Sequence, residues 1–438
     1  MKVKQGQLGF FLLPCNAVIV MIKELKLKNW KSFSESTLFI DPLTILIGAN
    51  ASGKSNTLDA LLFLNRVSSG VGIFQAIAGD ANLPPLRGGM EWVCRKPEKK
   101  FTLALVAEGL GKNQDYRYEV TVQVNGTKAE VFNEELTLLT YSQRSKRAKE
   151  KMLFSTGQEE LTSPGIPTHF STEANGKGKR RIELSRSHII LSQTETMNVR
   201  KEVQEGAKQV LLQLQRIFVF DPIPSHIRDY APFSETLLAD GSNIAGVLAG
   251  LEPVRKAEVE QTLTKYLKEL PERDIKRVWT EPVGKFSTDA MLYCEEGWDG
   301  QVTHEIDARG MSDGTLRYLA IVTALLTRES GSLLVIEEVD NGLHPSRAHI
   351  LIAMLRALGK ERGIDVIVTT HNPALLDAAG ARMVPFITVA HRHNVTGASE
   401  LTQLEDIRQL PKLMAGGSLG HLATEGSIES ALRLEECN

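Results

Sequence analysis

Cysteine is scarce in this chain, and its cysteines are far apart. The 438 residues include four, Cys15, Cys94, Cys294 and Cys437, and no two of them stand in the spacing C-x-x-C. Disulfide frameworks and cysteine-based metal sites need cysteines in close or regularly spaced sets. Neither therefore organises this fold, and we read the four residues as reduced thiols of a cytoplasmic protein.

The chain also lacks a net charge of either sign and a long apolar run. Its 51 Lys and Arg residues nearly balance 53 Asp and Glu residues, which leaves a formal net charge of −2 at pH 7. This balance gives no overall attraction to nucleic acid, so such a contact would have to come from a local patch. No apolar stretch after residue 20 approaches the length that spans a membrane, and we expect no membrane association.

The composition, with 42% apolar and 24% charged residues, is that of an ordinary globular protein. A chain of this length exceeds one average core, so we expect one large α/β domain with an insertion, or two domains. The first twenty residues imitate a short secretory signal, because Lys2 and Lys4 precede the apolar Phe10–Leu13. A strand-like alternation begins at Met21, so we expect Met21 to be the natural start and residues 1–20 to be a weakly ordered extension.

Residues 48–55 read Gly-Ala-Asn-Ala-Ser-Gly-Lys-Ser, which is the spacing G-x-x-x-x-G-K-[ST]. An apolar run at 43–47 precedes the motif, and a helical pattern follows it to about Arg66. Strand, glycine loop and helix in this order are the context of a phosphate-binding loop. The sequence therefore predicts nucleotide binding.

The residue types in this loop have separate chemical tasks. Gly48 and Gly53 let successive backbone N–H groups turn inward towards phosphate oxygens. The helix that begins near Lys54 adds its positive end, and the Lys54 ammonium group meets the terminal phosphates. The Ser55 hydroxyl is placed to hold Mg²⁺.

Apolar and alternating patterns predict further elements. We expect strands at 22–29, 36–41, 43–48, 101–106, 116–124, 129–139 and 217–220. Helical patterns cover about 195–216 and 252–270, and residues 67–99 read as a loop with short helices.

Residues 142–187 are rich in positive charge, with Ser, Thr, Gly and Pro between the basic residues. These are Arg144, Lys146, Arg147, Lys149, Lys151, Lys177, Lys179, Arg180 and Arg181. A solvated, partly disordered loop is the plainer interpretation, and we favour it. The alternative is a basic surface that touches DNA, RNA or an acidic partner.

Two carboxylates follow a predicted buried strand in the C-terminal part. The apolar run 333–336 is typical of a strand buried on both faces, and it ends in Glu337 and Glu338. Without the phosphate loop upstream, two solvated carboxylates in a turn would be the plainer interpretation. With that loop, Glu337 can bind Mg²⁺, directly or through water, and Glu338 can orient and polarise the attacking water.

Two further segments flank these carboxylates. Residues 311–317, Met-Ser-Asp-Gly-Thr-Leu-Arg, open a helix, and a small-residue turn at a helix N-terminus is an anion-binding arrangement. Residues 366–370 form another apolar strand, which ends at His371. A neutral imidazole there can hydrogen-bond the γ-phosphate or the attacking water, although a lone histidine at such a place is more often an ordinary strand-end residue.

Together these motifs resemble an ABC-type ATPase head of the SMC/RecF kind. The phosphate loop is similar to the first Walker motif of that group, and Leu334–Glu338 is similar to the second. Ser312–Thr315 resembles the signature motif, and Thr370–Pro373 resembles the histidine switch. The segment Lys28–Phe33 resembles the opening strand, whose following residues approach the nucleotide.

More narrowly, three segments resemble a prokaryotic family of stand-alone ATPases. They are Glu337-Glu338 followed by Asn-Gly-Leu-His-Pro at 341–345, Asp-Gly-Ser-Asn at 240–243, and Gly-Gly-Ser-Leu-Gly at 416–420. Members of that family often sit in phage-defence operons beside a nuclease or another effector.

The resemblance implies an α/β fold of the P-loop NTPase, ABC type, with a mixed β-sheet flanked by helices. We expect an antiparallel β section and a helical, basic insertion on this core. The expected divisions are an extension at 1–20, the N-terminal part of the head at 21–141, an insertion or lid at 142–304, the C-terminal part of the head at 305–390, and a C-terminal extension at 391–438.

The resemblance also assigns roles to residues of the site. It implies that ATP and Mg²⁺ are the cofactors, that Glu338 and His371 are catalytic, and that Ser55 and Glu337 hold the metal. Ser312, Asp313 and Gly314 would act in trans, on ATP held by a second protomer. The expected nucleotide-binding residues are Lys31, Ser32, Gly48, Asn50, Ala51, Ser52, Gly53, Lys54, Ser55 and Asn56.

The chain departs from the group's pattern at two places. Glu337 replaces the aspartate usual in the second Walker motif, and the glutamine of the Q-loop has no clear counterpart, since Gln75 is a weak candidate. After His371 the acidic residues form no D-x-D pattern, so we expect no nuclease within this chain.

We therefore predict a Mg²⁺-dependent ATPase head that forms a head-to-tail dimer, or a higher homo-oligomer, on ATP. It would control a separately encoded nuclease or toxin effector in antiphage defence. One alternative is a DNA repair or recombination ATPase of the RecF type that binds nucleic acid through 142–187. Another is a nucleotide-gated assembly scaffold with slow hydrolysis.

Overall fold

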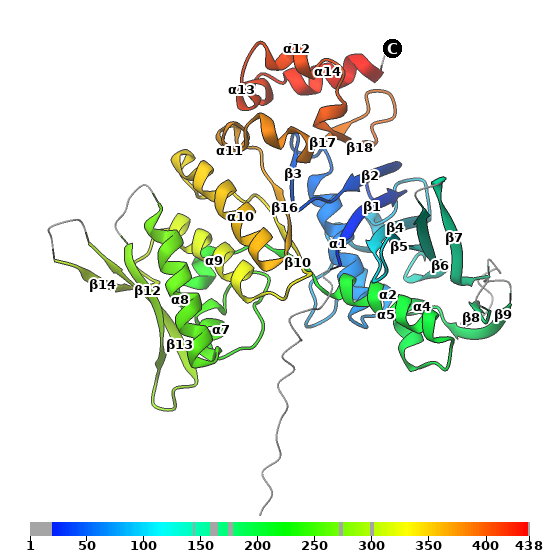
Figure 1. Ribbon diagram of the computed structural model, residues 1–438, viewed down its shortest axis with the longest axis horizontal. Coiled ribbons are helices and arrows are strands. Elements are labelled where there is room, and N and C mark those ends of the chain that lie inside the picture. Colours follow the sequence, from blue (N-terminus) through cyan, green and yellow to red (C-terminus); the bar gives the residue numbers. More distant parts are fainter. Residues whose placement is uncertain are drawn as a thin grey trace, which may run out of the picture.

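The computed structural model describes residues 20–142, 145–157, 165–173, 178–270, 275–297 and 302–436. A central sheet and its helices stand between two further sheets, one on each side, and a group of helices from the end of the chain lies above them (Figure 1). The expected weakly ordered extension at 1–20 lies, apart from Val20, outside the described residues, as do Cys15 and Cys437.

The central sheet has six strands in the order β10-β15-β16-β3-β17-β18. The first five run parallel, and β18 pairs antiparallel to β17. The strands are β10 (Ile217–Phe220), β15 (Leu333–Ile336), β16 (Asp365–Thr369), β3 (Leu43–Ile47), β17 (Ile387–Arg392) and β18 (Ser399–Gln403). The predicted mixed sheet of a P-loop NTPase is therefore confirmed.

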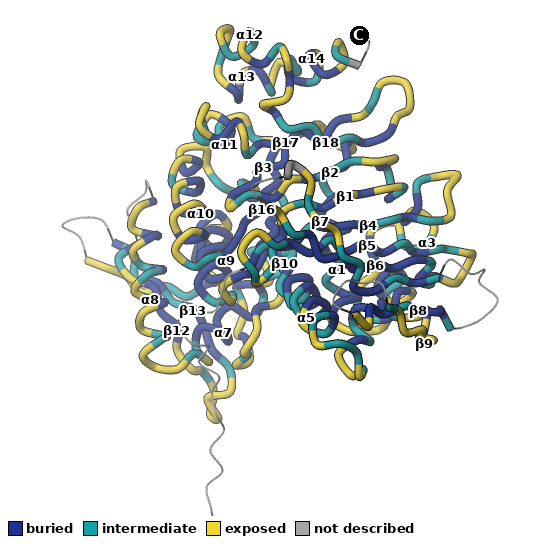
Figure 2. Tube along the Cα trace, turned by 45° about the vertical axis from the view of Figure 1, so that its right-hand side comes forward, coloured by how far each residue is buried: buried dark blue, intermediate teal, exposed yellow. Residues whose placement is uncertain are grey.

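Both faces of this sheet are covered, which explains its continuous apolar strands. In β15, Leu334 and Ile336 join one hydrophobic core, while Leu333 and Val335 join the other. The alternation follows from the two-residue period of a strand, because successive side chains point to opposite faces. Figure 2 shows β3 and β16 as buried, whereas β10 and β18 include half-buried residues.

The second sheet is antiparallel and has eight strands in the order β2-β1-β4-β5-β6-β7-β8-β9. They are β2 (Glu35–Phe39), β1 (Ile22–Lys28), β4 (Lys100–Glu108), β5 (Gln114–Asn125), β6 (Lys128–Ser142), β7 (Ser145–Thr156), β8 (Gly165–Ser171) and β9 (Lys179–Ser185). Helix α1 (Lys54–Ser68) shares a core with this sheet and with the central one: Leu58 and Leu61 belong to the same cluster as Leu103 and Val335. The helix after the phosphate loop thus joins the two sheets.

Short helices complete this side of the molecule. Helices α4 and α5 pack together, and α5 also contacts α1 and strands β5 to β7. The helices are α2 (Ile73–Ala78), α3 (Gly89–Trp92), α4 (Ile190–Gln193) and α5 (Lys201–Gln215), with a 3₁₀ turn at Thr194–Thr196. The predicted helical pattern at 195–216 is thus largely α5, and the expected loop with short helices at 67–99 contains α2 and α3.

The third sheet lies on the opposite side of the central sheet (Figure 1). Its strands are β11 (Ala231–Pro232), β13 (Asp289–Glu296), β12 (Ile275–Val283) and β14 (His304–Asp307). The helices beside it are α6 (Pro224–Ile227), α7 (Ile244–Gly250) and α8 (Pro253–Lys268). Helix α9 (Asp313–Thr327) packs between α8 and α10 (Ala348–Arg362), so it connects this part with the central sheet.

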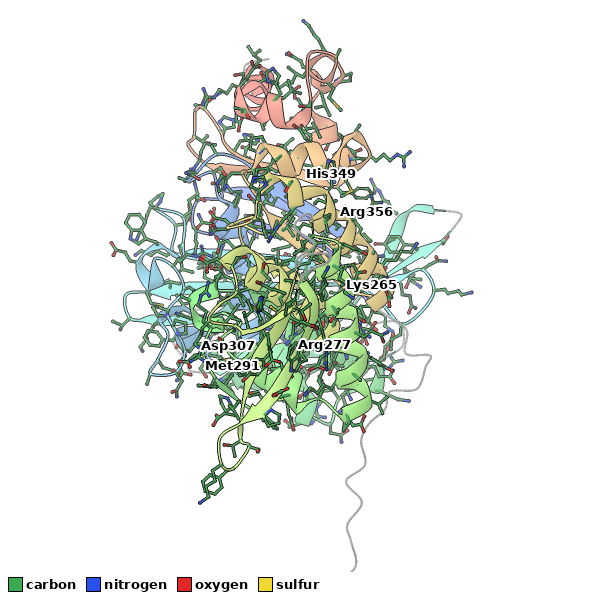
Figure 3. All side chains as sticks on the ribbon, turned by 90° about the vertical axis from the view of Figure 1, so that its left-hand side faces the viewer. Lys265, Arg277, Met291, Asp307, His349 and Arg356 are labelled. Carbon is green, nitrogen blue, oxygen red and sulfur yellow. The ribbon has the colours of Figure 1, made fainter. Side chains whose placement is uncertain are left out.

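The outer surface of α10 is visible in Figure 3, which labels His349 and Arg356 on it. These two residues are two helical turns apart and both are exposed, while Leu351 and Leu355 on the other face are buried. The helix therefore presents one apolar stripe to the core and one polar stripe to solvent.

The chain ends in a group of helices above the central sheet (Figure 1). Helix α13 packs against both α11 and α14. The helices are α11 (Pro373–Ala379), α12 (Leu410–Met414), α13 (Leu419–Thr424) and α14 (Ser427–Glu436), and further 3₁₀ turns lie at Pro345–Arg347, Ala381–Phe386 and Leu404–Asp406.

The structure corrects our interpretation of residues 142–187 as a loop. The described parts of this segment form β7, β8 and β9, which extend the antiparallel sheet. On β7 the basic residues precede Leu153 and Phe154, which are buried in the core of that sheet together with Ile166 of β8. Arg144 and Lys177 lie outside the described residues, and so does the side chain of Lys146.

The segment 142–304 is also divided differently from the single helical insertion that we expected. Strands β7 to β9 join the antiparallel sheet, β10 joins the central sheet, and β11 to β14 form the third sheet with α7 and α8. The sequence patterns did not predict β11 to β14, because their apolar residues are interrupted by turns and by charged residues.

Candidate functional site

The phosphate loop connects β3 to α1 and requires glycine at both ends. Gly48 has φ +139° and Gly53 has φ +122°, a region in which L side chains are strained. A Cβ atom on Gly48 would lie 2.1 Å from the Ala390 carbonyl oxygen, and one on Gly53 would lie 2.7 Å from Ser399 Oγ. The loop therefore packs against β17 and β18, where no side chain fits.

The loop surrounds a cavity of about 310 Å³. Its lining contains all the expected nucleotide-binding residues except Lys31, Ser32 and Gly48: Asn50, Ala51, Ser52, Gly53, Lys54, Ser55 and Asn56, together with Glu338 and Arg392. No side chain caps the N-terminus of α1, so its N–H groups remain available to an anion. Ser52 Oγ is buried without a hydrogen-bond partner among the described residues. These features fit a bound phosphate chain.

Lys54 folds back over the loop. Its Nζ donates to the carbonyl oxygens of Gly48, at 2.5 Å, and Ala49, at 3.0 Å. Burial lowers the pKa of Lys54, against the charges of Glu338, Glu337 and Glu429. A cation held by neutral carbonyls is ready to turn to a stronger anionic partner such as a phosphate.

The two expected metal ligands meet in the structure. Ser55 Oγ donates to Glu337 Oε1 at 2.5 Å, although the residues are 282 positions apart. A hydroxyl and a carboxylate are the hard oxygen donors that Mg²⁺ prefers beside phosphate oxygens. Burial raises the pKa of Glu337, but hydrogen bonds from Arg87 and Ser55 outweigh it and hold this pKa below the ordinary value. Glu337 is therefore ionised, as a metal ligand must be.

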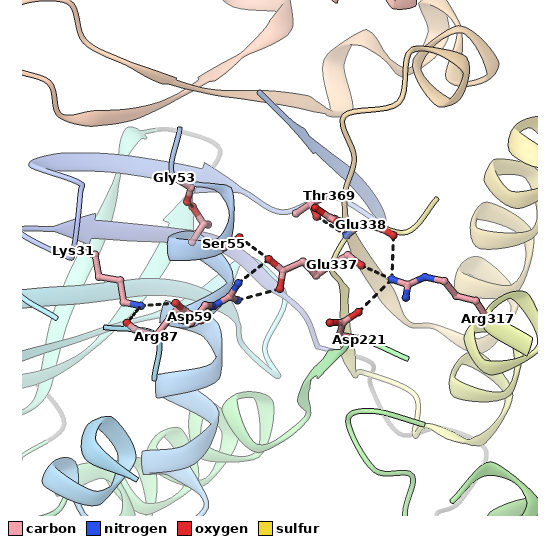
Figure 4. Close-up of polar contacts among 11 residues, drawn as sticks. Lys31, Gly53, Ser55, Asp59, Arg87, Asp221, Arg317, Glu337, Glu338 and Thr369 are labelled. Carbon is pink, nitrogen blue, oxygen red and sulfur yellow. Dashed lines mark hydrogen bonds and ion pairs between the residues drawn. The ribbon is translucent and has the colours of Figure 1, made fainter. Parts of the chain in front are cut away.

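Arg87, which the sequence analysis did not identify, binds the carboxylate of Glu337 as well. Its terminal nitrogens donate to Glu337 Oε1 and Oε2 at 2.8 and 3.0 Å, and its Nε donates to Asp59 Oδ1 at 3.1 Å (Figure 4). Lys31 Nζ binds the Asp59 carboxylate and the Arg87 carbonyl oxygen. Arg87 lies in the loop between α2 and α3. Gln75, the weak candidate for the Q-loop, is exposed on α2 and lines neither cavity of the site.

Glu338 has an unusual backbone conformation, with φ +47°. Two contacts hold it: its N–H donates to Thr369 Oγ1 at 2.8 Å, and its carbonyl oxygen accepts from an Arg317 terminal nitrogen at 3.0 Å. Left-handed backbone at a residue other than glycine costs about 1–2 kcal/mol and persists where its surroundings enforce it. The strain here aims the Glu338 side chain into the phosphate-loop cavity, which it lines.

Arg317 is the second residue that the sequence analysis missed. It lies on α9, is only 4% exposed, and donates to the carbonyl oxygens of Glu337 at 2.8 Å and Glu338 at 3.0 Å (Figure 4). It also donates to the carbonyl oxygen of Pro222 at 2.7 Å. An arginine in an otherwise apolar helix was the available signal, because an arginine is rarely buried unless other groups pair with its charge. Arg317 ties the helix of the signature motif to the backbone of both glutamates.

The signature residues lie elsewhere. Ser312 caps α9 by accepting from Thr315 N at 3.1 Å, and Asp313 pairs with Arg228 at 2.5 Å. A Cβ atom on Gly314 would lie 2.6 Å from the Gly342 carbonyl oxygen. Within the described part of the chain, none of these three residues lines the phosphate-loop cavity.

Three more of the predicted site residues lie near the loop, on different elements: His371, Lys31 and Ser32. His371 follows β16, the neighbour of β3, so it belongs to the same edge of the sheet as the loop; it is exposed and does not line the loop cavity. Ser32 Oγ accepts from Asn56 Nδ2 at 2.7 Å. Lys31 and Ser32 line a second cavity beside the first.

The described ranges contain no group of three or more His, Cys, Asp or Glu side chains that could hold a metal ion. The helices described here include none that combines the length and the apolar character needed to cross a bilayer.

Comparisons with known proteins agree with this geometry. Residues 21–215 match the family model described as "AAA ATPase domain", and residues 289–377 match the one described as "AAA domain, putative AbiEii toxin, Type IV TA system". The chain is 20% identical over 379 residues to an "ATP/GTP phosphatase" of Helicobacter pylori. The aligned region covers 82% of this chain and 87% of that protein.

Two SMC proteins are also similar. Over 47 residues the chain is 47% identical to the chromosome partition protein Smc of Methanococcus voltae. This short region covers 10% of this chain and 4% of that protein. The fold resembles a crystal structure of an SMC head bound to the C-terminal winged-helix domain of ScpA, with a TM-score of 0.51, 14% identity, and coverage of 87% of this chain and 97% of that one. The chain is therefore an ATPase: two parts of it match AAA ATPase domain models, and its fold is similar to that of an SMC head.

Proposed function

We propose that this chain is a Mg²⁺-dependent ATPase head that dimerises on ATP and controls a separately encoded effector. The observation that carries the proposal is the separation of its motifs. Glu338 lines the phosphate-loop cavity and Glu337 is bonded to Ser55 of the loop, whereas Ser312 to Gly314 lie outside that cavity at the start of α9. A second copy could supply the missing signature residues, and ATP would then be held between two heads.

Each residue of the site has a proposed task. The loop N–H groups and Lys54 hold the phosphates, and Ser55 with Glu337 would hold Mg²⁺, which neutralises phosphate charge when bound. Glu338 is the general base that orients the attacking water, and His371 hydrogen-bonds the γ-phosphate. Ser312 and Gly314 of the second copy approach that phosphate, and Arg317 ties the signature helix of each copy to the glutamate backbone of that same copy.

Light scattering with parallel phosphate release tests this mechanism. Glu338→Gln keeps the size and polarity of the side chain but cannot accept the proton, so turnover should fall by about 10²–10⁴-fold while the ATP-bound dimer accumulates. Glu361→Gln, an exposed change on α10, serves as the matched control and should behave as wild type. Assembly that ignores ATP in both proteins would contradict the proposal.

The effector and the setting of antiphage defence rest on the relatives. The description of one matching family model names a putative toxin of a type IV toxin–antitoxin system. The similar SMC head was solved with a bound partner protein. Co-expression with the product of the neighbouring gene, followed by infection with phage, tests both. We expect protection that requires the partner and that Glu338→Gln alters; protection by either protein alone would contradict control of an effector.

A nucleic-acid ATPase is the second candidate, and exposed basic residues favour it. Arg147 and Lys149 on β7, and Lys179, Arg180 and Arg181 on β9, are all exposed. DNA binding by the isolated protein that weakens steeply with salt would support this function. Replacing the three β9 residues with glutamine should then remove the binding and leave ATP turnover unchanged.

A further inference from the structure

A cavity of about 530 Å³ lies at the end of the central sheet opposite the phosphate loop. It is lined by Leu43 and Asp365, the first residues of the neighbouring strands β3 and β16, whereas the loop follows the last residue of β3. We propose that this cavity binds a small organic cation, whose amino group meets Asp365 and whose apolar body fills the rest of the space.

Most of the wall of this cavity is apolar. Its apolar residues are Met21, Pro42, Leu43, Ile364, Met383 and Phe386. Leu43, Ile364 and Met383 are at most 4% exposed, so this part of the wall is fixed in the core. Pockets of about 300–1,000 Å³ hold small organic molecules, and the volume here falls within that range. An aromatic ring such as that of Phe386 also attracts a cation.

Among the described lining residues, Asp365 is the charged one that is buried, with an exposed fraction of 7%. Its backbone N–H donates to Ser332 O at 3.1 Å. Its carboxylate forms no hydrogen bond or ion pair with any residue that the structure describes. Buried polar groups of native proteins nearly always have a partner. An unpaired carboxylate at a cavity wall therefore indicates a donor that is supplied from the cavity.

Two further carboxylates act on Asp365 from neighbouring segments. Burial, with the charges of Glu108 at the end of β4 and Asp41 before β3, raises the pKa of Asp365 to about 7. Lys23 of β1 lies 3.8 Å from Glu108, but its closer partner is Asp115, at 2.8 Å. A cation in the cavity would offset the repulsion among these carboxylates.

The positive groups of the wall are on its solvent side. Arg356 and Lys360 of α10 line the cavity, and both are exposed; Figure 3 labels Arg356. Water and salt screen exposed charges strongly, and they screen a buried charge much less. Asp365 therefore determines the sign of the charge that the cavity prefers.

Phenylbutylamine, phenylbutanol and phenylbutyrate test this preference, because they share an apolar body and differ in the charge of one end. At about pH 8 most of Asp365 is ionised and the amine is protonated. Calorimetry should then show the amine binding about 10- to 150-fold more tightly than the alcohol, the effect of a hydrogen bond to a charged group. Asp365→Asn should remove this preference, and Asp406→Asn, at an exposed position, should keep it.

Methyl resonances of methionine show where the amine binds. Met21 and Met383 line the cavity, so their methyl signals should shift when phenylbutylamine is added. Met291 is buried in β13 of the third sheet and is labelled in Figure 3. Its methyl signal is the control and should not shift.

Several results would overturn the cation site. They are equal binding of the three probes, tightest binding of phenylbutyrate, and no binding of any probe. A preference for the amine that persists in Asp365→Asn would also overturn it, as would a shift of the Met291 signal without shifts of Met21 and Met383. No nucleotide is present in these measurements, so each of these results leaves the proposed ATPase function standing.

Discussion

At the scale of single residues, Arg87 is the side chain whose contacts bear most directly on the metal. Both of its terminal nitrogens bind Glu337, and its Nε binds Asp59, so a guanidinium neutralises the carboxylate expected to hold Mg²⁺. A divalent cation and a guanidinium seek the same oxygens. The arriving metal should therefore compete with Arg87 for Glu337.

Arg87→Gln tests this competition. Without nucleotide the variant should lose about 1–2 kcal/mol of stability, because hydrogen bonds to charged groups are lost from a half-exposed side chain. Its affinity for Mn²⁺ in the presence of a non-hydrolysable ATP analogue, followed by electron paramagnetic resonance, should rise. Arg117→Gln removes a comparable ion pair with Glu150 on the surface and should change neither quantity appreciably. Weaker Mn²⁺ binding by Arg87→Gln would show that Arg87 assists the metal.

Glu338 provides a second prediction at this scale. Its φ of +47° is unfavourable for alanine and readily adopted by glycine. We therefore expect Glu338→Gly to be more stable than Glu338→Ala by about 1 kcal/mol, although both lose turnover alike. Chemical denaturation of the two variants checks the difference. Equal stabilities would mean that the backbone relaxes once the glutamate side chain is gone.

At the scale of elements, α9 is tied to the end of β15 through one buried guanidinium. Arg317→Lys keeps the charge but loses the planar fork that reaches two carbonyl oxygens. The variant should bind ATP with nearly wild-type affinity and turn it over about 10- to 100-fold more slowly, because a misplacement of about 1 Å at the reacting groups has effects of this size. Arg356→Lys on the exposed face of α10 is the control (Figure 3). Unchanged turnover in Arg317→Lys would show that the contact between α9 and the two glutamates does not affect catalysis.

Strand β16 begins with a carboxylate whose ionisation opposes folding. Burial, with the charges of Glu108 and Asp41, raises the pKa of Asp365 to about 7. The native state then holds this proton more tightly than the unfolded state, whose aspartate pKa is about 3.9. Consequently the contribution of Asp365 to the free energy of unfolding falls as the pH rises from about 4 to about 7, and it levels off above that.

Denaturation with urea between pH 4 and 8 checks this sign. Asp365→Asn cannot ionise, so its stability relative to wild type should rise steadily over that interval and then stay constant. Asp406→Asn, at an exposed position, should keep a constant difference from wild type. A constant difference for Asp365→Asn as well would mean that Asp365 titrates alike in the native and unfolded states.

At the scale of the whole molecule, the separation of the phosphate loop from the signature motif predicts complementation. Lys54→Ala disables the loop, and Ser312→Arg blocks the signature, so each variant alone should be inactive. In a mixed dimer, one composite site takes its loop from the Ser312→Arg copy and its signature from the Lys54→Ala copy. Phosphate release should therefore return on mixing, to about half the wild-type rate at most in the mixed dimers.

The matched control for this experiment is a mixture of Lys54→Ala with Glu338→Gln. Both changes lie at the loop cavity of their own copy, so no intact composite site can form in any combination. Recovery of turnover in this control, or none in the first mixture, would contradict the head-to-tail arrangement.

Local patterns in the sequence were enough for the phosphate loop, the pair of glutamates and most of the central strands. Glycines at 48 and 53 signal a backbone that other residues cannot adopt, and a strand buried on both faces has to be continuously apolar. These signals lie within a few residues of one another. They determined the fold class and the ATPase chemistry.

Only the tertiary structure decided which distant residues meet. Arg87 binds Glu337, which is 250 positions away in the sequence. Arg317 contacts the Glu338 carbonyl oxygen because α9 packs against the sheet. The same holds for 142–187, where the many charged residues made the apolar residues that continue a sheet hard to recognise in the sequence. Such contacts depend on how the chain closes over long separations, and that information is not present in any short stretch of it.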